Sequence, residues 1–205
     1  MSTQVSGQRS KTGNPGRDRL RVRQEDLYET PPGAVYALLE VEQLPHHIWE
    51  PACGRGAITD ILRNHGHTVR ATDLTDYGCP DSESRVDFLM ETQRSFTTSA
   101  IVTNPPYKLA DQFVRHALWH CPKAVMLLRL AFLEGTRRSD LVDHALSRVW
   151  VFRNRLPRMH RDGWDGPKAT STIAFAWFVF ERDHTGPIEL GRITRGAERE
   201  RHQRG

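Results

Sequence analysis

The sequence has no apolar run of about 18 residues, so it offers no candidate for a transmembrane helix. Its first residues also lack the apolar stretch of a secretion signal, and we therefore expect a cytoplasmic protein with no membrane partner. Cysteine is scarce. Cys53, Cys79 and Cys121 lie far apart and form no Cys-x-x-Cys pair, which argues against a disulfide framework and against a cysteine zinc site.

Metal-ligand spacing is equally rare among the histidines. Only His116 and His120 stand four residues apart on an expected helix. We interpret the two as surface or groove histidines and expect no metal site.

The basic charge is concentrated at the two ends of the chain. Residues 1–24 carry six Lys or Arg against one Asp, and residues 192–205 carry five Arg against two Glu. Because the whole chain has a net charge of +4, the segment 25–191 is net acidic. We expect a single domain over 25–191 between basic disordered tails, 1–24 and 192–205. Such tails suit a polyanion partner, and solubility alone explains them equally well.

Strand-like and helix-like segments alternate along the domain. Thr30 can cap a first helix that Pro31 or Pro32 opens. Short buried strands are expected near 47–50, 68–73, 85–90, 100–104 and 123–133, with helices near 57–65, 108–121 and 138–146. This alternation predicts an α/β fold, a mostly parallel sheet with helices on both faces. Segments 148–153 and 172–181 flank a long loop, which predicts a terminal hairpin or an edge pair with one antiparallel strand.

A glycine turn follows the first expected strand. Residues 50–56 read Glu-Pro-Ala-Cys-Gly-Arg-Gly, and Gly54 and Gly56 allow a ligand to approach the backbone closely. Thr59 stands where a dinucleotide motif has its third glycine, and Glu50 would repel a phosphate. The turn therefore suits a cationic ligand better than a dinucleotide.

Two further positions stand at expected strand ends. Asp73 follows the second strand, where it can accept hydrogen bonds from ribose hydroxyls or, alternatively, cap a turn. Asn104 opens an Asn-Pro-Pro-Tyr segment after the fourth strand. Taken alone, this segment is also explained as a tight turn.

The ordered set of "EPACGRG", an acidic residue after the second strand and "NPPY" resembles the S-adenosylmethionine-dependent amino-methyltransferases of DNA, over roughly residues 26–130. The resemblance implies a Rossmann-like class I methyltransferase fold and S-adenosylmethionine as cofactor. It includes "DLYETPP", whose aromatic and Thr-Pro residues would close over the methionine end, whereas "DF" would contact the adenine. The implied cofactor-binding residues are Tyr28, Thr30, Glu50, Pro51, Cys53, Gly54, Gly56, Asp73, Asp87 and Phe88.

The same resemblance implies a catalytic role for Asn104, Pro105, Pro106 and Tyr107. The Asn104 side-chain oxygen and the Pro105 carbonyl can each accept one N–H of an exocyclic amino group, which aims the nitrogen lone pair at the methyl donor. The prolines restrict the backbone, and Tyr107 can stack on an extruded base. No metal and no nucleophilic side chain is needed. Asn rather than Ser at the first position favours adenine N6 over cytosine N4.

Nucleic-acid contacts are expected in a basic loop near 153–171, because little of the domain remains for recognition. The candidates are Arg155, Arg158, Arg161, Trp164 and Lys168. A solvated loop whose tryptophan packs on the domain is the alternative interpretation.

The leading hypothesis is thus a small, phage-like DNA adenine-N6 methyltransferase that acts on a flipped-out base and needs no obligate protein partner. RNA is not excluded as the substrate. The alternatives are an RNA adenine or protein glutamine methyltransferase, or a non-catalytic nucleic-acid-binding protein on the same fold.

Overall fold

A computed structural model describes residues 28–94, 97–157 and 172–195. Its strands form one eight-stranded sheet in the order β3-β2-β1-β4-β5-β7-β6-β8. The strands are β1 His47–Glu50, β2 Thr68–Asp73, β3 Ser82–Ser84, β4 Ala100–Thr103, β5 Lys123–Arg129, β6 Leu146–Phe152, β7 Phe175–Glu181 and β8 Glu189–Ile193.

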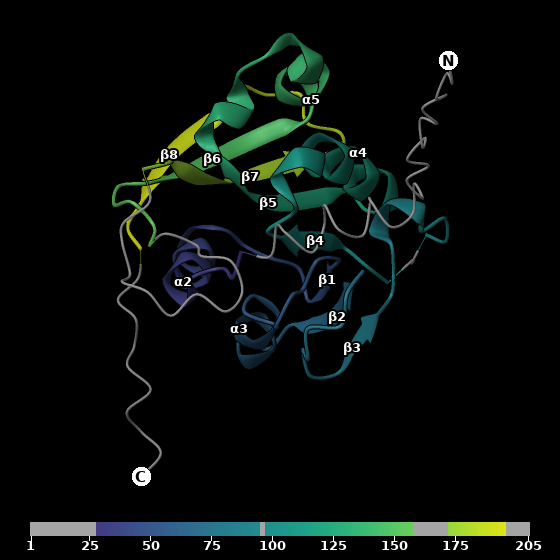
Figure 1. Cartoon of the computed structure of the whole chain (residues 1–205). Coiled ribbons are helices and arrows are strands. Elements are labelled where there is room, and N and C mark those ends of the chain that lie inside the picture. Colours follow the sequence, from purple (N-terminus) through teal and green to yellow (C-terminus); the bar gives the residue numbers. More distant parts are fainter. Residues whose placement is uncertain (1–27, 95–96, 158–171, 196–205) are drawn as a thin grey trace, which may run out of the picture.

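Helices cover both faces of this sheet. The α-helices are α2 Pro32–Val41, α3 Thr59–Asn64, α4 Ala110–His120 and α5 Ser139–His144, and short 3₁₀ helices are η1 Phe88–Met90, η2 Tyr107–Leu109, η3 Leu130–Leu133 and η4 Thr136–Arg138. Helices α2 and α3 lie on one face and α4 and α5 on the other (Figure 1). Across the described ranges, no helix has the length and apolar character needed to span a bilayer.

The pairing of the strands confirms the predicted architecture. Strand β1 pairs in parallel with β2 and β4, and β4 pairs in parallel with β5. Strand β7 runs antiparallel to both of its neighbours, β5 and β6. The sheet is therefore mostly parallel with one late antiparallel strand. Strands β6 and β7 pair antiparallel, as the predicted hairpin would, but they do not form the edge of the sheet. Strand β7 lies between β5 and β6, and β8 adds to β6 in parallel as the outermost strand.

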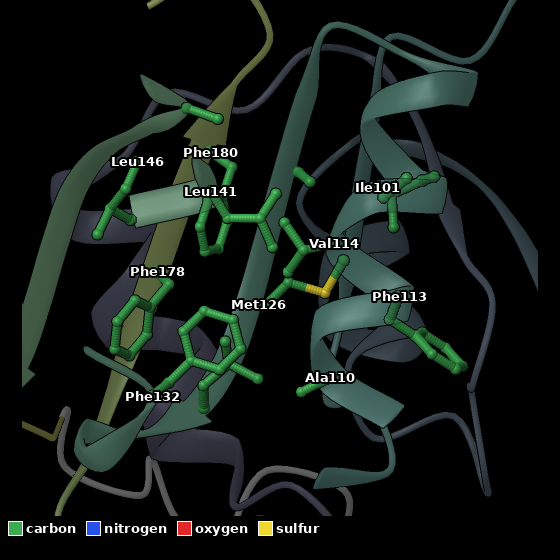
Figure 2. Packing of buried hydrophobic residues seen from close by; sticks show 14 of the residues in the cluster. Ile101, Ala110, Phe113, Val114, Met126, Phe132, Leu141, Leu146, Phe178 and Phe180 are labelled. Carbon is green, nitrogen blue, oxygen red and sulfur yellow. The ribbon is translucent and has the colours of Figure 1, made fainter. Parts of the chain in front are cut away.

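The central strands are apolar on both sides because each side is covered. In β7, Phe178 and Phe180 belong to the cluster under α4 and α5, whereas Trp177 and Val179 belong to the cluster under α2 and α3. Figure 2 shows Phe178 and Phe180 grouped with Phe132 on the first of these sides. Trp177 is fully buried.

Three local predictions were wrong. The segment 85–90 is not the third strand, because Asp87 accepts a hydrogen bond from the Leu89 N–H and starts the η1 turn, and the strand is Ser82–Ser84. Thr30 does not cap α2, whose N-cap residue is Pro31. The boundary of the C-terminal tail at 192 falls inside β8, where Ile193 is buried.

A buried ion cluster joins α2 to the far strands. The Glu42 carboxylate accepts hydrogen bonds from Lys123 Nζ at 2.6 Å, from Arg148 Nε at 3.0 Å and from Trp150 Nε1 at 2.9 Å. Burial raises the pKa of Glu42, but these donors outweigh burial and the net pKa is lowered. Arg148 also binds Glu181, so its charge is neutralised within the fold and does not contribute to the basic loop that follows.

Candidate active site

The sheet order brings three predicted sequence features together. Strand β1 lies between β2 and β4, and all three run in the same direction. The glycine turn after β1 is therefore flanked by Asp73 at the end of β2 and by Asn104 just after β4. The strand order reverses at this place, and open α/β sheets bind ligands outside the carboxyl ends of strands at such a switch point.

The glycine turn depends on conformations that other residues rarely adopt. Gly54 has φ of 55° and Gly56 has φ of 90°. A Cβ on Gly56 would also lie 2.9 Å from Cys79 Sγ, so this residue has no room for a side chain. The Gly54 N–H donates to Asp73 Oδ2 at 2.9 Å, which ties the turn to the neighbouring strand.

Asp73 takes the turn-stabilising role, one of the two that the sequence left open. Besides Gly54, the Thr75 N–H donates to Asp73 Oδ1 at 3.0 Å, so the carboxylate does stabilise local turns. Asp73 is only half-buried.

Glu50 and its neighbours lie behind the turn. Glu50 is 1% exposed and accepts a hydrogen bond from the hydroxyl of Thr59 at the start of α3. Burial raises the pKa of Glu50 well above its ordinary value. Pro51 and Cys53 are also buried, and burial raises the pKa of the Cys53 thiol. These three residues therefore shape and support the turn from inside rather than presenting side chains at its surface.

Asp87 and Phe88 occupy different environments. Asp87 is half-buried at the start of η1, close to the sheet edge formed by β2 and β3. Phe88 is 2% exposed, and its ring packs against Trp49 at 5.1 Å and Phe113 at 4.9 Å between centroids. The phenylalanine therefore supports η1 from the core, and Leu89 beside it is the half-buried residue.

The Asn104 amide is held by the segment that precedes α2. Its Nδ2 donates to the Tyr28 carbonyl oxygen and to Thr30 Oγ1, each at 3.1 Å. Because the nitrogen is oriented by these two acceptors, the amide oxygen lies on the opposite branch of the side chain. Tyr28 and Thr30, predicted to close over a cofactor, are thus in direct contact with the predicted catalytic loop.

Tyr107 lies within an aromatic group that the sequence did not reveal. It stacks on Tyr28 with centroids 5.9 Å apart and contacts Phe175 at 5.7 Å. The Arg129 guanidinium lies 4.7 Å from the Tyr107 ring centroid. Arg129 ends β5, whereas the strand predicted over 123–133 continued past it, because the apolar residues 130–133 form η3 instead. Nothing in the sequence linked Phe175 to this loop.

The predicted nucleic-acid contacts are mostly outside the described residues. Arg158, Arg161, Trp164 and Lys168 lie in the segment 158–171, which the structure does not describe. Arg155 is described and exposed.

His116 and His120 were predicted to be surface or groove histidines. His120 is 6% exposed and therefore does not lie on the surface, whereas His116 is half-buried, and the two Nε2 atoms are 3.1 Å apart. Among the described residues, no group of three or more His, Cys, Asp or Glu side chains is arranged to hold a metal ion.

Comparison by sequence gives no match to a family model and none to a curated protein. Solved structures do match. A protein assigned as an RNA methyltransferase from Pyrococcus horikoshii gives a TM-score of 0.57 at 10% identity, over 78% of this chain and 90% of that one. The 23S rRNA methyltransferase ErmE gives 0.51 at 16% identity, over 78% and 71%.

A modification subunit assigned to a type I restriction enzyme from Vibrio vulnificus gives a TM-score of 0.57 at 15% identity, over 84% of this chain. The chain spans about half of that subunit, 48% of its length. The strand order, the antiparallel β7 and these similarities show that the chain has the Rossmann-like fold of class I methyltransferases.

Proposed function

We propose that this protein is an S-adenosylmethionine-dependent methyltransferase that acts on the N6 amino group of adenine in DNA. The observation that carries the proposal is the fixed orientation of the Asn104 amide, whose Nδ2 is engaged by Tyr28 and Thr30. Because the nitrogen is the branch bound to the upstream segment, the amide oxygen is the branch that can accept a hydrogen bond from a substrate. The Asn104 side chain is half-buried, so its environment is drier than the surface and its dipole acts more strongly.

The residues at the switch point fit the cofactor. Asp73 is half-buried and can accept hydrogen bonds from ribose hydroxyls, and the glycine turn lets a ligand lie against peptide edges. Asp87 is half-buried and follows Val86, whose N–H donates to the Asp73 carbonyl oxygen at 3.0 Å. The cofactor would supply an electrophilic methyl group.

The chain would provide orientation and electrostatic stabilisation. An exocyclic amino group is a weak nucleophile because its lone pair is delocalised into the ring. Asn104 Oδ1 and the Pro105 carbonyl, on adjacent residues, would each accept one N–H and thereby favour a tetrahedral nitrogen. Pro105 is buried and Pro106 half-buried, so the backbone that carries these acceptors is restricted both by its rings and by packing.

The aromatic group around Tyr107 favours a planar acceptor. Tyr107 and Tyr28 form a stack beside Asn104, and a flipped base can extend such a stack. A protein glutamine side chain also carries an amide nitrogen that the same two acceptors can bind, but it has no ring to stack. RNA adenine is the second candidate, because it has the same base.

The proposal is tested by incubating the protein with labelled S-adenosylmethionine and, separately, unmethylated duplex DNA, total RNA and a protein extract. Label recovered as N6-methyladenine from DNA is the expected result. Label found only in RNA nucleosides or only in glutamine would show that DNA adenine is not the acceptor.

The catalytic assignment is tested by Asn104→Ala, which should abolish transfer and leave cofactor affinity within about twofold, because Asn104 is proposed to act on the acceptor nitrogen and not on the cofactor. Asn64→Ala is the matched control, since Asn64 is exposed at the end of α3, and it should keep full activity. Full activity of Asn104→Ala would remove Asn104 from the mechanism.

A further inference from the structure

A pocket of about 250 Å³ lies directly beside the catalytic loop. Tyr107 and Lys108 form one side of it, and Arg129 and Arg138 contribute two further cations. The remaining lining is apolar: Ala110, Leu128, Ala131 and Phe132. No carboxylate is among the lining residues, so the pocket presents positive charge above an apolar floor.

The fold places this pocket at the same edge of the sheet as Asn104. Strands β4 and β5 are parallel neighbours, with Thr103 paired to Met126, and both run toward this edge. Arg129 is the last residue of β5, and its guanidinium lies over the Tyr107 ring. The pocket is therefore continuous with the aromatic group proposed to receive the base.

The cations of this pocket differ from those on the surface around it. Arg115 and Arg137 lie nearby in the chain but are each paired with a carboxylate, Asp140 and Asp111 respectively. Within the described residues, neither Lys108 nor Arg129 forms an ion pair, and both are exposed. A cation that has no internal counter-ion at a substrate-facing edge is available for an external anion.

Arg138 gives the pocket a rigid wall. Its guanidinium donates to the backbone carbonyls of Phe132, Ala131 and Glu134, and it lies 4.8 Å from the Phe132 ring centroid. Phe132 in turn packs on Phe178 (Figure 2). Their ring centroids are 5.6 Å apart. These contacts fasten Arg138 to the η3 segment, and Arg138 lines the pocket with its positive charge.

We infer that this pocket binds a backbone phosphate of the nucleic-acid strand next to the target adenine, with Lys108 and Arg129 as the contacting cations. The inference rests on the proposed function, because it takes the base at Asn104 as the point from which the strand continues. The cations of the pocket suit a charged phosphate, and its apolar and aromatic residues suit the nonpolar face of a base or sugar. A nucleotide unit carries both. The phosphate contacts predicted from the sequence lie in the loop 153–171, and neither Lys108 nor Arg129 was among them.

The test measures binding of a short single-stranded oligonucleotide with one adenine, over a range of salt concentrations, by the full chain saturated with cofactor. The double variant Lys108→Gln/Arg129→Gln should lower the magnitude of the log–log salt slope by about 0.7 for each phosphate that the protein no longer neutralises. The double variant Arg115→Gln/Arg137→Gln removes the same charge from neighbouring paired sites. It should leave the slope close to that of the wild type.

A second oligonucleotide identifies which phosphate is bound. It carries a neutral methylphosphonate linkage beside the adenine, and it should lose affinity for the wild type but not for Lys108→Gln/Arg129→Gln. Equal slopes for the two double variants, or an equal methylphosphonate effect in wild type and variant, would overturn the inference.

Methyl transfer is measured separately, so the two proposals fail separately. If adenine is methylated but Lys108→Gln/Arg129→Gln has the same salt slope as the wild type, the proposed function stands and the phosphate-binding role of the pocket is refuted. A wild type with no salt-dependent binding of the oligonucleotide would overturn the pocket inference, and label in glutamine would overturn the proposed acceptor.

Discussion

Replacement of Thr30 by valine tests whether the segment before α2 orients the Asn104 amide, for which we propose a catalytic role. Thr30 is 4% exposed, and its hydroxyl accepts a hydrogen bond from Asn104 Nδ2 at 3.1 Å. Valine keeps the shape of threonine but replaces the hydroxyl by a methyl group. One N–H of Asn104 would then face an apolar group that water does not reach. The other N–H would keep the Tyr28 carbonyl at 3.1 Å.

The expected magnitude follows from the cost of one missing hydrogen-bond acceptor. Leaving a buried donor unsatisfied costs about 1–3 kcal/mol. If this cost destabilises the amide orientation that transfer requires, it raises the activation free energy. Each increase of about 1.4 kcal/mol lowers the rate of methyl transfer tenfold. We therefore expect Thr30→Val to lower the single-turnover rate about tenfold or more, with a change of less than about twofold in cofactor affinity.

The assay is single-turnover methyl transfer with enzyme and cofactor in excess, together with calorimetric titration of the cofactor. Thr30→Ser is the matched control, because it restores the hydroxyl and should restore most of the rate. A Thr30→Val variant with the wild-type rate would refute the orienting role. A rate that Thr30→Ser fails to recover would also refute it, since loss of packing would then explain the defect.

Three other perturbations have defined outcomes. Gly54→Val should abolish cofactor binding in a calorimetric titration, because φ of 55° strains a β-branched residue by about 1–3 kcal/mol at the turn that the cofactor would contact. Gly66→Ala is the control for strain alone, since Gly66 has φ of 86° and open space around it, and this variant should bind the cofactor normally. Gly191→Ala should lower the thermal midpoint, because its Cβ would lie 2.0 Å from the Trp150 ring, and an unchanged midpoint would contradict this packing. Burial first, and then the charge of its neighbour, lowers the pKa of His120 from 6.5 to about 4. Its neutral form therefore stabilises the fold fully above pH 6.5, and about 3 kcal/mol should be lost as the pH falls to 4. Urea unfolding of His120→Leu should lack that loss, and an identical pH profile would exclude His120 as its cause.

The order of the secondary-structure elements was predictable from the sequence because it depends on local periodicity. Apolar runs bounded by turn residues define β1, β2, β4 and β5, and their alternation with helical segments predicts a mostly parallel sheet. The glycine turn and the Asn-Pro-Pro-Tyr segment were recognisable for the same reason. Their backbone demands, left-handed glycines and proline-restricted φ, are properties of consecutive residues.

Other features of the fold depend on long-range pairing and could not be predicted. The position of β7 between β5 and β6 and the addition of β8 at the edge are decided by which strands meet, not by any strand's own composition. Glu42 gave no sign in the sequence of becoming a buried acid. Its partners Lys123 and Arg148 are 81 and 106 residues away.

The sequence by itself determined which residues carry the proposed chemistry, because the motifs are contiguous and their order along the chain sets which strand end each one follows. Tertiary structure alone decided what those residues touch. It placed Phe88 in the core and tied Thr30 to Asn104, 74 residues away. It also brought Arg129 and Phe175 to Tyr107, because parallel and antiparallel neighbours in one sheet bring distant strand ends to a common edge, and side-chain contacts follow from that proximity.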